Sequence, residues 1–158
     1  MEKRALDQKW FELQQAQVAF EKYFIGSKIV YPNVSFGPRF AIDDGSYLDM
    51  TSFGVNSAEL WLLGVLNSSV TNFFFSKLGI ERRGGYQEFK TQYVSQIPIP
   101  ASAPEQQLEI EGRVEQILAQ KKENPEADVS ALEAEIDQLV YKLYDLTPEE
   151  IEIIEGKV

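Results

Sequence analysis

A short stretch with three prolines divides this chain into two parts of different character, and this division limits the folds open to it. The prolines are Pro98, Pro100 and Pro104. A proline ring fixes φ and removes a backbone donor, so such a stretch ends regular secondary structure. Before it, aromatic and β-branched residues mix with turn residues, whereas after it apolar residues recur at helical spacing. We therefore predict an α+β domain over residues 1–100 and an antiparallel helical hairpin over residues 101–158.

The second part contains two apolar stripes that indicate two helices. Residues three and four apart share one face of a helix, and both stripes have this spacing. Their members are Leu108, Ile110, Val114, Ile117 and Leu118 in the first stripe, and Val129, Leu132, Ile136, Leu139, Val140 and Leu143 in the second. Asn124-Pro125 marks the turn between them, and Thr147-Pro148 followed by Glu150 is typical of the capped start of a third, short helix. We expect the two stripes to be mainly each other's partners.

The first part alternates helix and strand signals and predicts a small mixed β-sheet with packed helices. Periodicity, turn residues and capping residues give the expected elements. These are a helix over residues 4–24, a strand at 28–32, a β-hairpin made of 39–43 and 47–50 around Asp44-Gly45, a capped and buried helix at 56–66, a helix at 70–78 and a strand at 93–99. Between the two later helices, Asn67 and Ser68 are interpreted as a buried structural kink.

The net charge of −10 is confined to the second part. Residues 1–100 hold ten Lys and Arg against ten Asp and Glu, whereas residues 101–158 hold five against fifteen. Affinity for nucleic acid comes from neutralising phosphates, which an acidic helical face opposes at short range. Only the first hundred residues are therefore candidates to touch DNA, and the hairpin should face away from it.

Residue types that are absent remove whole classes of chemistry. The chain has no cysteine, so it has no disulfide or thiolate, which suits a cytoplasmic protein, and it has no histidine. Asp43, Asp44 and Asp49 are hard-cation ligands by type, but their spacing fits no EF-hand loop and Asp44-Gly45 is explained as a turn. We predict no catalytic residue, no metal and no cofactor in this chain.

The residues with the chemistry of DNA recognition gather at positions 82–92. Arginine, lysine and glutamine bind base edges and phosphates, tyrosine offers a face for stacking, and glycine lets a backbone approach closely. The candidates are Arg82, Arg83, Gly84, Gly85, Tyr86, Gln87, Lys90 and Gln92. The alternative is a solvated loop in which Glu81 and Glu88 pair with these cations. Phe89 and Tyr93 are expected in the core, and Tyr86 is expected to be exposed.

Three residues from the predicted hairpin side extend the candidate surface. They are Lys28, Arg39 and Tyr47. The alternative is that they are ordinary strand-edge residues, since three aspartates nearby weaken the positive field.

Five segments of the chain, taken in order, resemble the TaqI-like C-terminal specificity domain of restriction–modification enzymes. They are Lys-Ile-Val-Tyr-Pro at 28–32, Leu-Leu-Gly-Val-Leu-Asn-Ser at 62–68, Gly-Tyr-Gln-Glu-Phe-Lys at 85–90, Gln-Ile-Pro-Ile-Pro at 96–100, and the stretch from Glu135 to Thr147. The resemblance extends over about residues 9–155, and its last segment is the most specific.

This resemblance implies a DNA target-recognition role beside a separate N6-adenine methyltransferase part. That enzyme class needs an Asn/Asp-Pro-Pro-Tyr/Phe loop around the flipped adenine, and Tyr-Pro-Asn-Val at 31–34 is not that sequence. S-adenosylmethionine is accordingly expected in the methyltransferase part, on the same or a partner chain, and double-stranded DNA is the expected ligand here. Whether the parent enzyme also has endonuclease activity does not follow from these residues.

Three other functions compete with this interpretation. A protein-interaction module without DNA contact is favoured by the net charge of −10. A half-specificity subunit of a type I system shares the layout of a domain followed by helices, although a hairpin with short arms argues against it. A stand-alone nuclease is opposed by the lack of a Pro-Asp…Glu-x-Lys arrangement.

Overall fold

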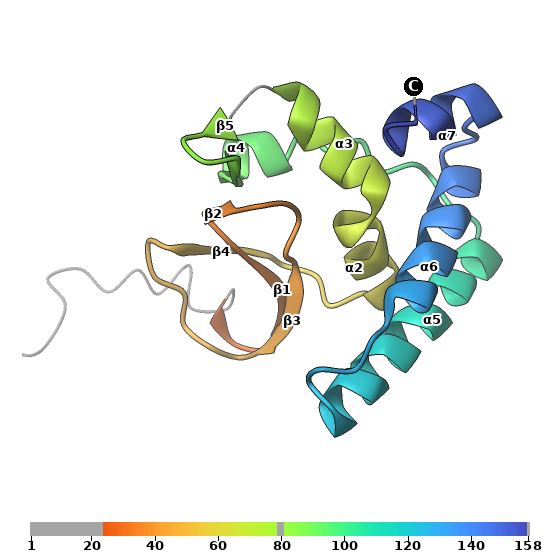
Figure 1. Cartoon of the computed structure of the whole chain (residues 1–158). Helices are drawn as coiled ribbons and strands as arrows, with labels where there is room; N and C mark the ends of the chain where they lie inside the picture. Colours follow the sequence, from red (N-terminus) through yellow and green to blue (C-terminus); the bar gives the residue numbers. More distant parts are fainter. Residues whose placement is uncertain (1–23, 79–80, 158) are drawn as a thin grey trace, which may run out of the picture.

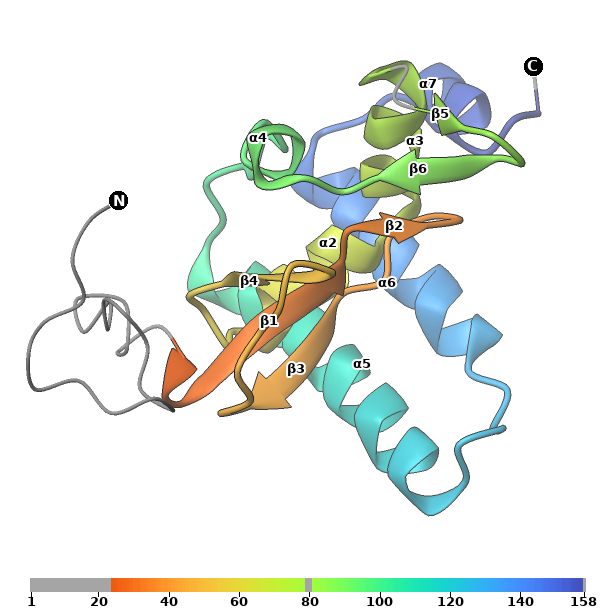
Figure 2. The same cartoon turned by 90° about the vertical axis from the view of Figure 1, so that its left-hand side faces the viewer.

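A computed structural model describes residues 24–78 and 81–157 (Figure 1). The helix expected at residues 4–24 lies outside these ranges except for Phe24. Two small sheets occupy one side of the molecule, the long helices α5 and α6 occupy the other, and α2 lies between them in both views (Figures 1 and 2). The α+β fold class is confirmed. Every strand pairing among the described residues is antiparallel, so the prediction of a mixed sheet is wrong.

The first sheet has the strand order β3-β1-β4, in which β1 (Ser27–Pro32) is central. Both β3 (Ala41–Asp44) and β4 (Ser52–Val55) pair with it and not with each other. The predicted β-hairpin of residues 39–43 and 47–50 is therefore wrong, and residues 47–50 lie in the long connection from β3 to β4. The strand β1 is also the most buried of the three, with Lys28, Ile29 and Tyr31 all buried. The sequence signal at Asp44-Gly45 marks a turn, but not one that joins paired strands.

The second sheet is smaller and has the order β2-β6-β5. It comprises β2 (Val34–Ser35), β6 (Tyr86–Glu88) and β5 (Glu81–Arg82). The Phe89 N–H donates to the Asn33 carbonyl at 2.8 Å, which holds the end of β6 beside the start of β2. This sheet carries most of the residues predicted to touch DNA.

Two consecutive helices, α2 (Leu60–Asn67) and α3 (Ser69–Leu78), form the centre of the molecule. The predicted capping box at the start of α2 is absent, since Glu59 is the N-cap and no side chain caps the helix. The predicted buried kink is confirmed at Ser68, which donates from Oγ to the Val65 carbonyl at 2.7 Å, and is wrong for Asn67, which is exposed.

The Asn67 side chain beside this kink fastens α2 to the segment before β3. It accepts from the Phe40 N–H and donates to the Phe40 carbonyl, both at 2.9 Å. Its amide also donates to the Leu63 carbonyl of its own helix at 3.1 Å. The amide therefore replaces backbone pairings that the end of α2 and the Phe40 segment would otherwise lack.

A short helix, α4 (Thr91–Val94), stands where the sequence predicted a strand. The Tyr93 and Val94 N–H groups both donate to the Lys90 carbonyl, at 2.8 and 3.0 Å. This turn buries Val94 and then Ile97, which an extended chain would place farther apart. The expected core roles are confirmed for Phe89, which is fully buried, and for Tyr93, which packs partly buried against the core.

The last part consists of α5 (Pro104–Glu123), α6 (Ser130–Leu143) and α7 (Pro148–Ile154). The predicted helical hairpin is confirmed, and α5 and α6 are its two arms. The predicted capping box of Thr147 and Glu150 at the start of α7 is also confirmed. No helix among the described residues combines the length and the apolar character needed to cross a membrane.

The helix α5 packs as closely on α2 as on α6, so its apolar stripe is not mainly a partner of the α6 stripe. The helix α6 does pack mainly on α5, as predicted. A Cβ placed on Gly64 would lie 2.6 Å from Ile110 Cγ2 and 3.1 Å from Val114 Cγ2, which shows how near the two backbones approach. One hydrophobic core therefore runs across residue 100 and includes side chains from both predicted parts. The division into two domains stays a prediction.

Candidate nucleic-acid interface

The predicted recognition loop is a tight turn between β5 and β6. Gly84 and Gly85 have φ of 87° and 82°, the left-handed region in which a side chain is strained, and the Gly85 N–H donates to the Arg82 carbonyl at 3.3 Å. The hydrogen bond makes Arg83 and Gly84 the central residues of a four-residue turn, and a positive φ at the second of them favours glycine. The glycine pair thus fixes the turn that presents Arg83 and Tyr86.

The strand register places the key side chains on one face of the second sheet. Arg82 pairs with Tyr86, and Ser35 at the end of β2 pairs with Gln87. The residue after β2, Phe36, therefore comes beside Tyr86, and the two ring centroids lie 3.9 Å apart. Directly opposed residues of an antiparallel pair project from the same face. A row of Phe36, Tyr86 and Arg82 therefore crosses the three strands, and we call it the recognition row.

Glu88 is a buried carboxylate that two of the candidate cations share. Its residue is 6% exposed, its Oε1 accepts from Arg82 Nε at 2.8 Å, and its Oε2 lies 3.3 Å from Lys90 Nζ. The hydrogen bond from Arg82 is the main reason that the pKa of Glu88 lies below its ordinary value, and Lys90 adds to the effect. This pairing is the one that the solvated-loop alternative predicted, but it also fixes where the arginine and lysine stand.

The remaining loop candidates differ in their exposure. Arg83 is exposed and forms no ion pair within residues 24–78 and 81–157. Gln87 points to the inner face of the sheet, where its Oε1 is buried without a hydrogen-bond partner among the described residues. Gln92 is exposed on α4. The structure therefore brings Arg83 and the recognition row to the surface, with Gln87 behind them.

The structure does not support Lys28 as part of an exposed surface. This residue is 2% exposed, and its Nζ donates to Asp43 Oδ2 at 2.7 Å and to the Phe24 carbonyl at 3.2 Å. A buried ammonium group needs such partners, which explains the aspartate opposite it on β3. Arg39 and Tyr47 are exposed, and the Tyr47 ring stacks on Phe24 with centroids 5.4 Å apart.

Phe36 and Val34 lie on the same face of the second sheet as Tyr86, although neither was predicted as a site residue. Phe36 is 59% exposed, and its ring centroid lies 3.9 Å from that of Tyr86, which is itself exposed as expected. The strand β2 is only two residues long, so its apolar alternation is too short to detect. The Phe-Gly-Pro sequence at 36–38 was the one available signal, because it marks a strand end.

Residues 3–99 match the family model of the TaqI-like C-terminal specificity domain. The chain belongs to this family. The match contains the whole recognition row, the glycine turn and both sheets, and it ends before α5. A domain of this family serves DNA target recognition in restriction–modification enzymes, is not itself catalytic and is associated with a catalytic part.

The turn between the acidic helices α5 and α6 of this specificity domain lies away from the recognition row. It is at the opposite end of the molecule from the β5–β6 turn in both views (Figures 1 and 2). At physiological salt a charge is screened within about 8 Å. The acidic residues near the α5–α6 turn therefore have little influence on the potential at the recognition row.

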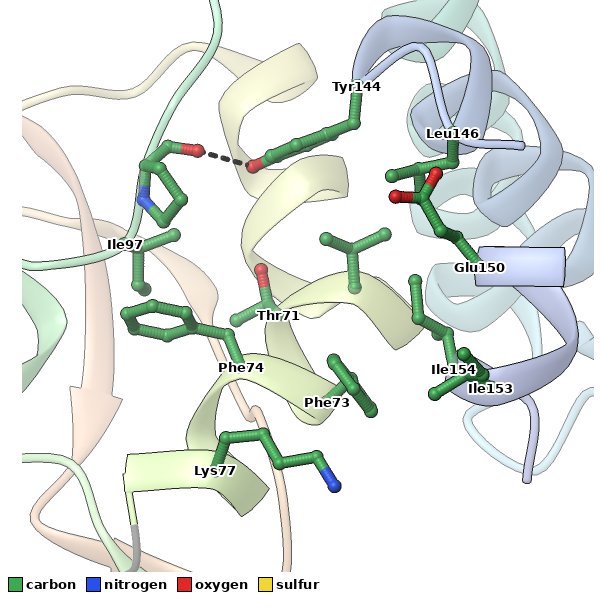
Figure 3. A pocket seen from close by; sticks show the side chains of 12 residues that line it. Thr71, Phe73, Phe74, Lys77, Ile97, Tyr144, Leu146, Glu150, Ile153 and Ile154 are labelled. Carbon is green, nitrogen blue, oxygen red and sulfur yellow. Dashed lines mark hydrogen bonds between the residues drawn. The ribbon is translucent and has the colours of Figure 1, made fainter. Parts of the chain in front are cut away.

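A separate apolar pocket of about 350 Å³ lies between α3, the segment at Ile97 and the α6–α7 corner (Figure 3). Phe73 and Phe74 form one wall, and Ile153 and Ile154 of α7 form the other.

The polar groups in the walls of this pocket already have partners. The Tyr144 hydroxyl donates to the Pro98 carbonyl at 2.7 Å, and the Thr71 hydroxyl donates to the Val65 carbonyl at 2.8 Å. Lys77 Nζ lies 4.8 Å above the Phe73 ring at the rim. Lys77 and Glu150 are the charged residues of the lining, and Glu150 Oε2 accepts from the Thr147 N–H at 2.8 Å. The surface of the pocket is mostly apolar, which suits docking rather than chemistry.

Proposed function

We propose that this specificity domain reads a short double-stranded DNA site and positions a separate N6-adenine methyltransferase part on it. The observation that carries the proposal is the recognition row, in which two aromatic rings and a guanidinium stand side by side next to the exposed Arg83. Planar donors and apolar rings are the groups that read base edges in the major groove. The adenine would be flipped and methylated in the catalytic part, which would also hold S-adenosylmethionine.

Arg82 and Arg83 are expected to contact different parts of the DNA. Arg82 gives Nε and one terminal nitrogen to Glu88, so its remaining N–H groups point in a fixed direction toward solvent. Such a group is suited to a base edge, where geometry decides affinity. Arg83 is unrestrained at the turn and suits a phosphate, which accepts a cation from many directions. Because few phosphates are neutralised, the chain alone is expected to bind weakly at physiological salt.

The test compares DNA binding by the full-length enzyme that contains this domain with that of an Arg82→Ala/Arg83→Ala variant. A lost base contact costs about 1–3 kcal/mol, so we expect affinity for the preferred site to fall at least tenfold. The matched control is Arg113→Ala, because Arg113 pairs with Glu135 on the distant helices. Unchanged affinity and site preference in the double variant would show that the loop does not read DNA.

Single variants separate the two arginines. Arg83→Ala is expected to weaken binding to all sequences alike and to reduce the slope of log affinity against log salt by about 1. Arg82→Ala is expected to relax the preference at one base position.

A second surface supports a second role, docking of the catalytic part. The apolar pocket between α3 and α7 is exposed in this chain, and the family places a specificity domain beside a catalytic part. We propose Ile153→Glu as the test, because Ile153 lines the pocket and is exposed. Leu108→Glu is the matched control, since Leu108 is exposed on α5 outside the pocket. Association of separately produced parts should weaken more than tenfold for Ile153→Glu alone, and equal effects of the two variants would refute this docking site.

A further inference from the structure

Phe36 and Tyr86, the aromatic pair of the recognition row, are exposed and do not belong to the hydrophobic core. Phe36 is 59% exposed and Tyr86 is 40% exposed, and their rings lie at 35° to each other. The Phe36 ring also reaches over the glycine turn, where a Cβ placed on Gly85 would lie 3.8 Å from Phe36 Cε1. The two rings and the turn therefore form one rigid apolar projection.

The neighbours of this projection limit what it can bind. Val34 extends the apolar surface along β2, while Arg82, Arg83 and Lys90 border it with positive charge. A matching ligand must bring negative charge together with a small apolar group at a fixed distance. Double-stranded DNA meets this requirement at thymine, because the C5-methyl group is the apolar feature of a base edge in the major groove.

We propose that Phe36 and Tyr86 contact thymine C5-methyl groups, so that the recognised site contains at least one A·T pair read through its methyl group. This inference rests on the proposed function. The rings hold each other in place, so little side-chain freedom is lost on binding. Burying one methyl group favours binding by about 0.8 kcal/mol, which corresponds to about a fourfold gain in affinity for each contacted thymine.

The experiment removes the methyl group from the DNA and, separately, the ring from the protein. Two pools of random-sequence duplexes are prepared that are identical except that uracil replaces thymine in the second. The full-length enzyme is titrated with each pool, as wild type and as Phe36→Ala/Tyr86→Ala, Phe36→Leu and Leu108→Ala variants. Leu108→Ala is the matched control, because Leu108 is an exposed apolar residue on α5, outside the second sheet. Phe36→Leu keeps an apolar side chain, and thermal unfolding of each variant checks that it folds.

We expect the wild type to bind the thymine pool more tightly than the uracil pool, by about fourfold for each thymine that the rings contact. Phe36→Ala/Tyr86→Ala should lose most of this preference, Phe36→Leu should keep part of it, and Leu108→Ala should keep all of it. Equal binding of both pools by a wild type that still selects its site would overturn the methyl contact and leave the proposed function intact. An undiminished thymine preference in the double variant would also overturn it. If the wild type bound neither pool, but bound anionic lipid vesicles or a protein, the proposed function and this inference would both fail.

Discussion

The carboxylate of Glu88 determines the charge that the recognition row presents. It neutralises part of the positive charge of Arg82 and Lys90, and because it pairs with both it also fixes the distance between them. The types of these residues were predictable from the sequence, because arginine, lysine and glutamate within a few positions suggest pairing. Their geometry was not, because it depends on the register of a two-residue strand with a three-residue strand.

Replacing Glu88 should change affinity and selectivity in opposite directions. In Glu88→Gln the two cations lose their shared counterion, so we expect tighter binding to random DNA and a salt slope that steepens by about 1. We also expect discrimination between the preferred site and random DNA to fall, because the arginine is no longer held in one orientation. Binding titrations at several salt concentrations measure both effects. A variant that kept full discrimination would show that Arg82 needs no support from Glu88.

The buried pair of Lys28 and Asp43 makes stability depend on pH in the acid range. The hydrogen bond from Lys28 is the main cause that lowers the pKa of Asp43 from 3.8 to about 2. A carboxyl with a lowered folded-state pKa stabilises the protein fully above its unfolded value. That stabilisation should be lost as pH falls from about 4 through 2.

Variants at this pair test the direction of the effect. Asp43→Asn leaves a buried ammonium group without its counterion, so it should destabilise the protein more than Lys28→Met, which leaves a carboxylate that can reach water. Denaturant titrations between pH 5 and 2 measure both variants. The part of the acid dependence that belongs to Asp43 should disappear in Asp43→Asn and shrink in Lys28→Met, because Ser46 also donates to Asp43 and lowers its pKa. The reverse order of stability would show that the lysine is not held in a dry site.

Helices were easier to predict than strands in this chain, and the reason lies in their contacts. The α5 and α6 stripes repeat over many residues, and the α7 cap is a local sequence pattern. The strands of the first sheet instead depend on which neighbour β1 accepts on each edge, and the sequence of β3 and β4 does not encode that choice. The predicted strand at 93–99 failed because burial of Val94 and Ile97 favoured a helical turn.

One cap in the fold joins two helices that are far apart in sequence. Asp137 of α6 accepts from the Ser69 N–H at 2.8 Å and from the Ser69 hydroxyl at 2.5 Å, at the first residue of α3. A carboxylate at a helix N-terminus satisfies free N–H groups and complements the helix dipole. This contact gives a physical reason for the Glu-Ile-Asp sequence at 135–137, which lies beyond the family match.

The contact between α2 and α5 predicts opposite effects of the same substitution at two glycines. Gly64→Ala places a methyl group against Ile110 and Val114, so we expect a loss of about 1–3 kcal/mol in the free energy of unfolding. Gly112→Ala, on α5, meets nothing within 4 Å, and should stabilise the protein by about 0.5–1 kcal/mol because alanine favours the helix. Chemical denaturation measures both. A neutral Gly64→Ala would mean that α5 moves easily relative to α2.

At the scale of the whole molecule, the sheets and the acidic helices share one core. Ile110 and Val114 of α5 and Ile136 and Val140 of α6 are buried with Leu63 and Val65 of α2. The charge and the spacing of apolar residues do change near residue 100. Neither of them indicates which faces of the two parts pack together. The predicted pairing of the two stripes left out α2, and the division of the chain into two domains stays a prediction.

Truncation tests whether the predicted two parts fold independently. A fragment of residues 1–100 loses the helices that cover α2, so we expect it to show no cooperative thermal unfolding. A fragment of residues 1–146 lacks only α7, which has no buried residues, and should keep a cooperative transition. Circular dichroism during heating distinguishes them. A cooperative transition in the shorter fragment would establish two independent domains.

The two left-handed glycines at the β5–β6 turn also separate positions that must be conserved from positions that tolerate substitution. Any other residue at Gly84 or Gly85 would strain the backbone and move the strands that it joins. Arg83, Tyr86 and Phe36 lie around the turn with exposed side chains, and changing them disturbs no core contact. A laboratory library for altered DNA preference should therefore randomise these three positions and keep the glycine pair constant.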